Sequence, residues 1–152
     1  MKAAFSFIFF MLFLAGLAFV NLKGVQEQSD ARDATLVDLS ASAWRPTHIG
    51  EMRLDNDTEM FVDFGFSGQV TGHGGCNRFF GSYELEHGSL QVSPLGSTRM
   101  ACPEPTMSFE LSFLEALQKP TIASLADNKL NLRVDQKEVV LRFVAIDKTE
   151  EN

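Results

Sequence analysis

Apolar residues recur at every second position through most of the chain from about residue 42 onward. One such run places Met60, Val62 and Phe64 in alternation with Asp63 and Gly65. Because successive side chains of a β-strand point to opposite faces, this period of two predicts strands with one buried face. Short turns containing Gly or Asn separate the runs and favour hairpins. We therefore expect about eight antiparallel strands, at residues 43–52, 58–66, 69–73, 79–86, 89–93, 121–126, 129–134 and 138–146.

One segment, residues 106–119, breaks this period and lies between Pro105 and Pro120. Its apolar residues recur at helical spacing and form one arc of a helical wheel: Met107, Leu111, Leu114 and Leu117. Such a face needs a cover, and one end of a small barrel would supply it. The expected fold is therefore mainly β, a small antiparallel barrel of roughly eight strands with one packed α-helix.

Glu110 lies inside the apolar arc of that helix. A buried carboxylate needs a partner, and Arg78 and Arg99 are the candidates that the sequence suggests. A catalytic role for Glu110 is not favoured, because no second acid stands near it at a local spacing.

The N-terminal segment has the pattern of an export signal. Met1-Lys2 precedes an uncharged apolar run at residues 3–20, which predicts either a cleaved signal peptide or a retained membrane anchor over residues 1–24. Leu17 stands where a lipoprotein signal has its acylated Cys, so lipidation there is not expected. We expect a polar linker at 25–39, the folded domain at 40–147 and a polar tail at 148–152. Either form of the leader exports the domain, which is then free or tethered to the membrane by the N-terminal segment.

The charge balance argues against a nucleic-acid partner. The chain has 13 Lys and Arg against 20 Asp and Glu, a formal charge of −7. Lys2 and Lys23 belong to the leader, so the remainder is more acidic still, and it has no basic cluster. Binding to a phosphate backbone needs a basic face.

Cys76 and Cys102 are the only cysteines. An even count in an exported chain indicates a structural disulfide first. A redox pair is a weaker alternative, because the C-x-x-C spacing is absent. A metal site with His73, Cys76 and Cys102 is weaker still, because zinc sites usually show a second compact ligand pair.

The sequence offers no catalytic or cofactor motif. Gly72, Gly74 and Gly75 surround His73, which we read as a turn residue, but no Lys-Ser/Thr follows them as in a phosphate-binding loop. We expect Asn77 to hydrogen-bond nearby backbone, as Asn does in turns. No nucleophile motif occurs, so we expect no catalytic residues, no metal and no cofactor.

Two ordered motifs carry a resemblance to a known family. The first runs from Gly75-Cys76-Asn77 to Gly81 and Tyr83, and the second comprises Thr98 and Met100-Ala101-Cys102. Leu90-Gln91-Val92 lies between them, and Trp44 opens the first expected strand. Over about residues 40–146 the chain resembles the META domain family, the HslJ-like heat-shock and envelope proteins.

The resemblance implies a small β-barrel with a packed helix, in bacterial envelope proteins linked to heat shock, motility or antibiotic tolerance. Together with the leader, it implies an exported bacterial envelope protein in the periplasm, soluble or tethered to the inner membrane. No catalytic residues are established for the family, and the presence of both family cysteines supports the disulfide. We expect a non-enzymatic envelope protein that contributes to stress tolerance through binding or scaffolding. The alternatives are a barrel that holds a small apolar ligand and, less favoured, a thiol-redox protein. The expected partner is an envelope protein or a small apolar ligand, with membrane contact through residues 3–20 if the leader is retained.

Overall fold

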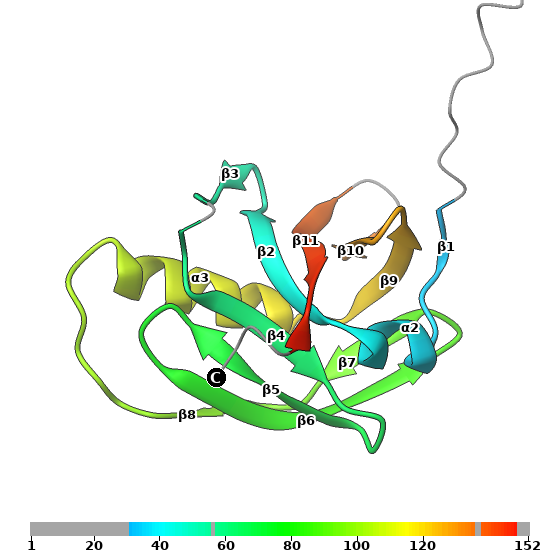
Figure 1. Cartoon of the computed structure of the whole chain (residues 1–152), viewed down its shortest axis with the longest axis horizontal. Coiled ribbons are helices and arrows are strands. Elements are labelled where there is room, and N and C mark those ends of the chain that lie inside the picture. The colour runs from blue at the N-terminus through cyan, green and yellow to red at the C-terminus, as the bar shows by residue number, and fades with distance from the viewer. Residues whose placement is uncertain (1–30, 56, 136–137, 149–152) are drawn as a thin grey trace, which may run out of the picture.

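Eight antiparallel strands close into a barrel in the computed structural model, which describes residues 31–55, 57–135 and 138–148 (Figure 1). The strands are β2 (Ala43–Ile49), β4 (Met60–Phe64), β5 (Gln69–Gly74), β6 (Arg78–Glu86), β7 (Ser89–Val92), β9 (Thr121–Ala126), β10 (Lys129–Arg133) and β11 (Val139–Ile146). Their order around the barrel is β9-β10-β11-β2-β4-β5-β6-β7, and pairing of β7 with β9 closes it. The predicted fold class is confirmed, and most strands begin or end within two residues of their expected bounds.

Two hairpins have the tight turns that their sequences favour. His87-Gly88 joins β6 to β7, and Asp127-Asn128 joins β9 to β10. All four residues have positive φ, between 47° and 80°. Two consecutive residues of positive φ match the right-handed twist of the flanking strands, so these turns fix the register of both hairpins.

The folded domain begins earlier than the sequence suggests. Short strand β1 (Arg32–Asp33) pairs with β9, and helix α2 (Leu36–Ala41) follows it. Thr35 and Asp38 form a reciprocal capping box at the start of α2, and Arg32 donates two hydrogen bonds of 2.6 and 2.7 Å to the Asp38 carboxylate. Leu39 is fully buried. Part of the expected linker at 25–39 is therefore structured, because local capping and one buried Leu outweigh its polar composition.

Large side chains fill the barrel interior. The buried aromatic residues include Trp44, Phe64, Phe79, Phe113 and Phe143. Phe113 of the main helix makes edge-to-face contacts with Phe79 and Phe143, at centroid distances of 6.0 and 6.2 Å. The interior is thus a packed core rather than an open cup.

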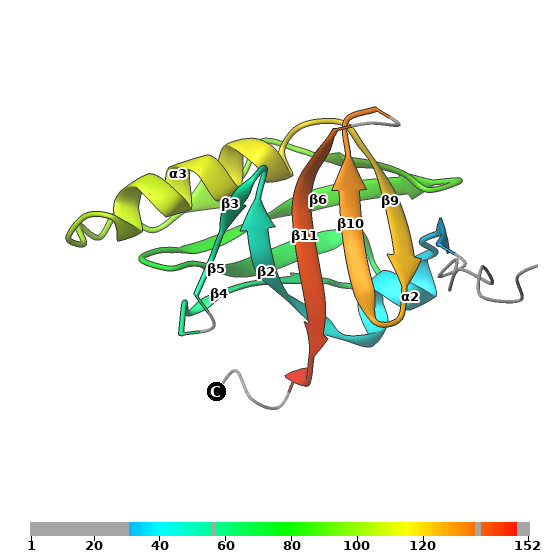
Figure 2. The ribbon, with the colours of Figure 1, turned by 90° about the horizontal axis from the view of Figure 1, so that it is seen from above.

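Helix α3 (Thr106–Leu117) packs against β5 on one side and against β2 and β11 on the other, at one end of the barrel (Figures 1 and 2). Its buried residues are Glu110, Phe113, Ala116 and Leu117, whereas Leu111 is 60% exposed. The predicted apolar arc was therefore misplaced around the helix axis. The helix is turned so that Phe113 enters the aromatic core and Glu110 meets the β5–β6 turn.

Two further short strands lie outside the barrel order: β3 (Met52–Arg53) pairs with β2, and β8 (Gly96–Ser97) pairs with β6. The leader at 1–24 and residues 149–152 of the predicted tail lie outside the described residues. Within the described part of the chain, none of the helices combines the length and apolar character that a membrane crossing requires.

Candidate functional site

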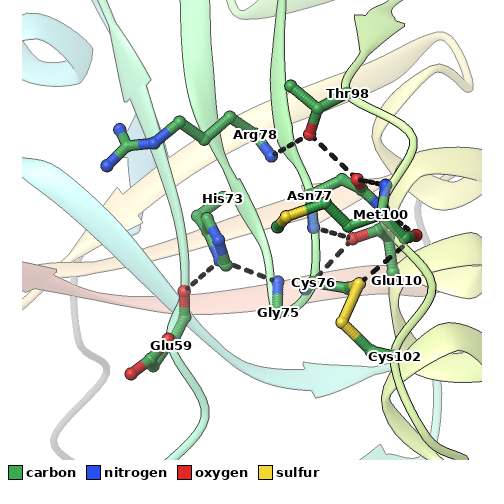
Figure 3. Close-up of a disulfide and its surroundings, with 10 residues drawn as sticks. All are labelled: Glu59, His73, Gly75, Cys76, Asn77, Arg78, Thr98, Met100, Cys102 and Glu110. Atoms are coloured by element: carbon green, nitrogen blue, oxygen red, sulfur yellow. Dashed lines mark hydrogen bonds between the residues drawn. A yellow bond between two sulfur atoms is a disulfide. The ribbon is translucent and has the colours of Figure 1, made fainter.

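A disulfide joins Cys76 to Cys102, with 5.9 Å between their Cα atoms (Figure 3). Cys76 follows β5 in the turn to β6, after Gly75 at a φ of +100°, and Cys102 lies in the loop between β8 and α3. The predicted disulfide is confirmed. Because both cysteines are in the disulfide, neither can serve as a thiolate ligand in the alternative metal site of His73, Cys76 and Cys102. Among the described residues, no group of three or more His, Cys, Asp or Glu could hold a metal ion.

Glu110 of α3 is buried beside this disulfide and accepts three hydrogen bonds (Figure 3). Its Oε2 accepts from the backbone N–H groups of Cys76 and Asn77 at 3.1 and 2.6 Å, and its Oε1 accepts from Asn77 Nδ2 at 2.8 Å. The expected partners Arg78 and Arg99 make no ion pair with it. Neutral N–H donors satisfy the carboxylate instead, because α3 presents it to the inward-pointing amides of the β5–β6 turn.

Gly74 makes this approach possible. A Cβ built on Gly74 would lie 2.7 Å from both Cγ and Oε2 of Glu110, closer than real Cβ contacts occur. The last residue of β5 therefore has to be Gly so that the carboxylate can reach the amides beyond it. Its role is close packing, a different property from the positive φ of Gly75.

Asn77 connects this carboxylate to the second motif (Figure 3). Its Oδ1 accepts from the Met100 N–H at 2.7 Å and from Thr98 Oγ1 at 2.9 Å, and its Nδ2 also donates to the Met100 carbonyl at 3.3 Å. The expected local turn bond of Asn77 is thus replaced by bonds to residues more than twenty positions away. Cys76 Sγ lies 3.6 Å from the Met100 carbonyl, a contact without a proton, since a disulfide sulfur carries none. We call Cys76, Asn77, Thr98, Cys102 and Glu110 the disulfide hub.

Other motif residues lie elsewhere in the barrel. Trp44 is buried and donates from Nε1 to the Leu39 carbonyl at 2.9 Å. Tyr83 donates to the Gly65 carbonyl at 2.8 Å, and its pKa is raised by burial and by the nearby Asp63. Gly81 leaves room for the Leu95 side chain. The motif therefore has two parts, one in the hub and one in the core.

The remaining candidate residues are Met100 and Ala101, which are exposed, and His73, which lies in a strand and not in the expected turn. Met100 is 56% exposed, and its contribution is the backbone N–H and carbonyl that bind Asn77; the Ala101 side chain is also exposed. His73 lies in β5 and not in a turn, with Nδ1 3.0 Å from the Glu59 carbonyl and 3.1 Å from the Gly75 nitrogen. Its place in the sheet follows from pairing with Phe61 and Arg78 on the flanking strands.

The structure also shows two surface hollows that sequence reasoning missed. One, of about 370 Å³, lies on the β4–β5–β6 face and is lined by Phe61, Asp63, Thr71, Arg78 and Lys148, among others. The other, of about 360 Å³, lies between the 55–59 loop and the start of α3 and has an acidic rim of Asp55, Asp57 and Glu59. Their lining residues come from separate strands and loops, so no local spacing in the sequence could have indicated them.

Comparison with known protein families identifies the domain that contains the hub. The sequence model of the META domain family matches residues 37–147, which include both motifs and the hub. The chain belongs to the META domain family.

Solved structures share the fold of this META domain. One NMR structure is 25% identical with a TM-score of 0.61, covering 75% of this chain and 97% of that one. An NMR structure of a protein from Burkholderia xenovorans is 24% identical, with a TM-score of 0.58 and coverages of 76% and 90%. A crystal structure of a DUF4847 family protein from Bacteroides vulgatus is 14% identical, with a TM-score of 0.52 and coverages of 72% and 96%. Among curated proteins, the search finds no match.

The hub of the META domain uses its polar groups internally. The Glu110 carboxylate and both ends of the Asn77 amide are hydrogen-bonded within the chain, and neither residue is more than 7% exposed. META is not a known enzyme family. The hub thus explains its own part of the family motif: these residues hold the β5–β6 turn, the 98–102 loop and α3 together.

Proposed function

We propose that this META domain acts in the bacterial cell envelope as a non-enzymatic binding or scaffolding protein and contributes to tolerance of heat or antibiotic stress. The observation that carries the proposal is the disulfide hub. A largely buried disulfide beside a buried carboxylate suits a small domain that works in an oxidising compartment. The apolar leader expected at residues 1–24 points to the same compartment.

The packing of the interior favours binding at the outer surface. Phe79, Phe113 and Phe143 meet in the barrel, and Trp44 and Phe64 are buried with them. An apolar ligand held inside would have to displace these side chains. A barrel that holds a small apolar ligand in its interior is therefore less well supported than a protein that binds its partner on the outer surface.

The thiol-redox alternative is also less well supported. Cys76 is 2% exposed and Cys102 is only partly exposed, and the C-x-x-C spacing of redox pairs is absent. Catalytic disulfides need an accessible sulfur for thiolate attack. A structural role accounts for the same geometry without that requirement.

Complementation of a deletion strain tests the proposal. The strain would receive the complete chain, a form without residues 1–24 that stays in the cytoplasm, or a Cys76→Ala/Cys102→Ala form. We expect the complete chain, and not the cytoplasmic form, to restore survival after heat or antibiotic challenge. The double variant should complement at temperatures at which it remains folded.

Three results would contradict the proposal. A deletion strain with unchanged heat and antibiotic survival removes the stress role. Full rescue by the cytoplasmic form removes the envelope role. Failure of the double cysteine variant at a temperature at which it is folded and abundant would favour the redox alternative.

A further inference from the structure

The hollow on the β4–β5–β6 face brings two cations together on an acidic protein. Arg78 and Lys148 line it from opposite parts of the sequence, the first at the start of β6 and the second just after β11. The whole chain has a formal charge of −7, so its composition does not lead one to expect two cations in one hollow. Asp63 is the single carboxylate among the residues that line the hollow, which leaves an excess of one positive charge.

Arg78 lines this hollow, and within the described residues its guanidinium group is not in an ion pair. Thr98 of the hub holds the Arg78 backbone. The Arg78 N–H donates to Thr98 Oγ1 at 3.2 Å, and the Thr98 N–H donates to the Arg78 carbonyl at 3.0 Å. Figure 3 shows the Arg78 side chain extending away from the disulfide. Five N–H donors in a planar fork suit a carboxylate or phosphate.

Lys148 retains donors as well. Its Nζ donates to Asp63 Oδ1 at 2.6 Å, and both side chains are partly exposed. An ammonium group has three protons, so the bond to Asp63 leaves two for a ligand. Asp63 thereby fixes the position of Lys148 and limits the positive charge of the hollow.

The remaining walls indicate the rest of the ligand. Phe61 and Asp63 alternate with inward-facing residues of β4, so both lie on the outer face, and the Phe61 ring is half-buried there. Thr71 lies opposite Asp63 on β5 and contributes a hydroxyl at the same level of the sheet. An aromatic ring beside cationic donors suits a ligand with one anionic end and one flat apolar part.

From this arrangement we infer a binding site for a small organic monocarboxylate that carries an aromatic or similarly flat apolar group. Arg78 binds the carboxylate, Lys148 adds a second donor, and Phe61 contacts the apolar part. A volume of about 370 Å³ suits a small molecule. The excess of one positive charge matches a monoanion better than a phosphate dianion. The site rests on the function proposed above, for which it names a ligand class.

An NMR titration of the full-length protein, isolated from the envelope and labelled with ¹⁵N, tests the site. The probes are 3-phenylpropionate, its neutral counterpart 3-phenylpropanamide, and inorganic phosphate. We expect saturable shifts at the amides of Phe61 and Thr71 with millimolar 3-phenylpropionate, and much weaker shifts with the other two. No saturable shift, or equal binding of the amide or of phosphate, would overturn the inference.

Matched variants separate this site from general charge attraction. Arg78→Gln should weaken binding of 3-phenylpropionate about tenfold, whereas Arg53→Gln, at an exposed cation on β3, should leave it unchanged. Lys148→Gln provides a second loss-of-binding variant if Arg78→Gln is poorly folded. Equal affinities of the Arg78 and Arg53 variants would disprove the role of Arg78.

Asp63→Asn gives a change in the opposite direction. Removing its negative charge should tighten binding of 3-phenylpropionate and allow phosphate to compete, because the hollow then has an excess of two positive charges. Unchanged affinity and selectivity would contradict the charge balance inferred here. A negative titration together with successful complementation would remove this site and leave the envelope function in place.

Discussion

Asn77 donates hydrogen bonds to both carboxylate oxygens of Glu110, although the two residues are 33 positions apart in the sequence. Oε2 accepts from the Asn77 backbone N–H at 2.6 Å, and Oε1 accepts from Asn77 Nδ2 at 2.8 Å. Cys76, the preceding residue, is covalently joined to Cys102 just before α3. A polar link and a covalent link therefore connect the β5–β6 turn to α3 and to the loop that leads into it.

Loss of the Glu110 carboxylate should destabilise the barrel strongly. Glu110→Ala leaves three buried N–H groups without an acceptor and should lower the free energy of unfolding by about 3 kcal/mol. Glu110→Gln keeps one oxygen acceptor and should cost less. Urea denaturation measures both effects, and exposed Glu115→Ala on the same helix is the control, with a change within about 0.5 kcal/mol. Equal stabilities of the Glu110→Ala and Glu115→Ala proteins would contradict the role of the hub.

The disulfide should stabilise the fold without being required for it. It closes a segment of 26 residues, so the chain-entropy model gives about 3–4 kcal/mol. Cys76→Ala/Cys102→Ala should lower Tm by roughly 15 °C and retain a cooperative transition by circular dichroism. Reductant should lower the Tm of the wild type and leave that of the double variant unchanged. A wild-type Tm insensitive to complete reduction would refute this expectation.

Gly74 should tolerate no side chain while Glu110 occupies its present position. Gly74→Ala places a methyl group 2.7 Å from the Glu110 carboxyl group and should cost about 1–3 kcal/mol. Gly65→Ala is the matched control, since its Cβ would make only ordinary contacts, the nearest at 3.5 Å. In a double-mutant cycle, Gly74→Ala should cost less in a Glu110→Ala background. Additive effects would show that the two residues do not interact.

The orientation of α3 predicts a large contrast between two apolar residues two positions apart. Phe113→Ala removes a fully buried ring that contacts Phe79 and Phe143, and should cost about 3–5 kcal/mol. Leu111 is 60% exposed, so Leu111→Ala should change stability by less than about 1 kcal/mol. Chemical denaturation of both variants measures the contrast. A larger effect at Leu111 would restore the helix orientation that the sequence favours.

The capping box of α2 should give a pH-dependent contribution. Hydrogen bonds from Arg32 and Thr35 hold the pKa of Asp38 well below its usual range. Because the folded pKa is lower than the unfolded one, Asp38 stabilises the fold above the unfolded value near 4 and loses this effect as the pH falls toward the folded pKa. The stability difference between wild type and Asp38→Asn should therefore be larger at pH 7 than at about pH 3. A difference that does not shrink in acid would argue against the ion pair.

Patterns of local spacing were sufficient for the strands and hairpins but not for the hub. Alternation around Val62 and the Asp127-Asn128 turn depends on adjacent residues, and both appear in the structure as expected. The position of Glu110 indicates a buried acid that needs a partner. Its donors are two backbone amides and the Asn77 side chain, however, and no pattern of charged residues reveals them. Sequence patterns that consider only charged partners therefore suggest Arg78 and Arg99, neither of which forms an ion pair with Glu110.

Helix orientation and surface sites were also beyond local patterns. Residues 106–119 carry Leu111 and Phe113 on nearly opposite faces of the helix, and the position of Phe79 and Phe143 decides which of the two faces is buried. The hollow at Arg78 and Lys148 depends on bringing together residues 70 positions apart. The α2 capping box is visible in the sequence as Thr35 and Asp38, although polar composition led us to expect a linker there.

By itself, the sequence determined the mainly β barrel, its packed helix, the disulfide and the family. These follow from periods, turn residues, cysteine count and motifs, all of which are properties of neighbouring positions or of short ordered patterns. The tertiary structure alone decided which face of α3 is buried, what satisfies Glu110 and where two cations meet on an acidic surface. Those outcomes depend on closure of the barrel, which sets distances between residues that local chemistry leaves independent.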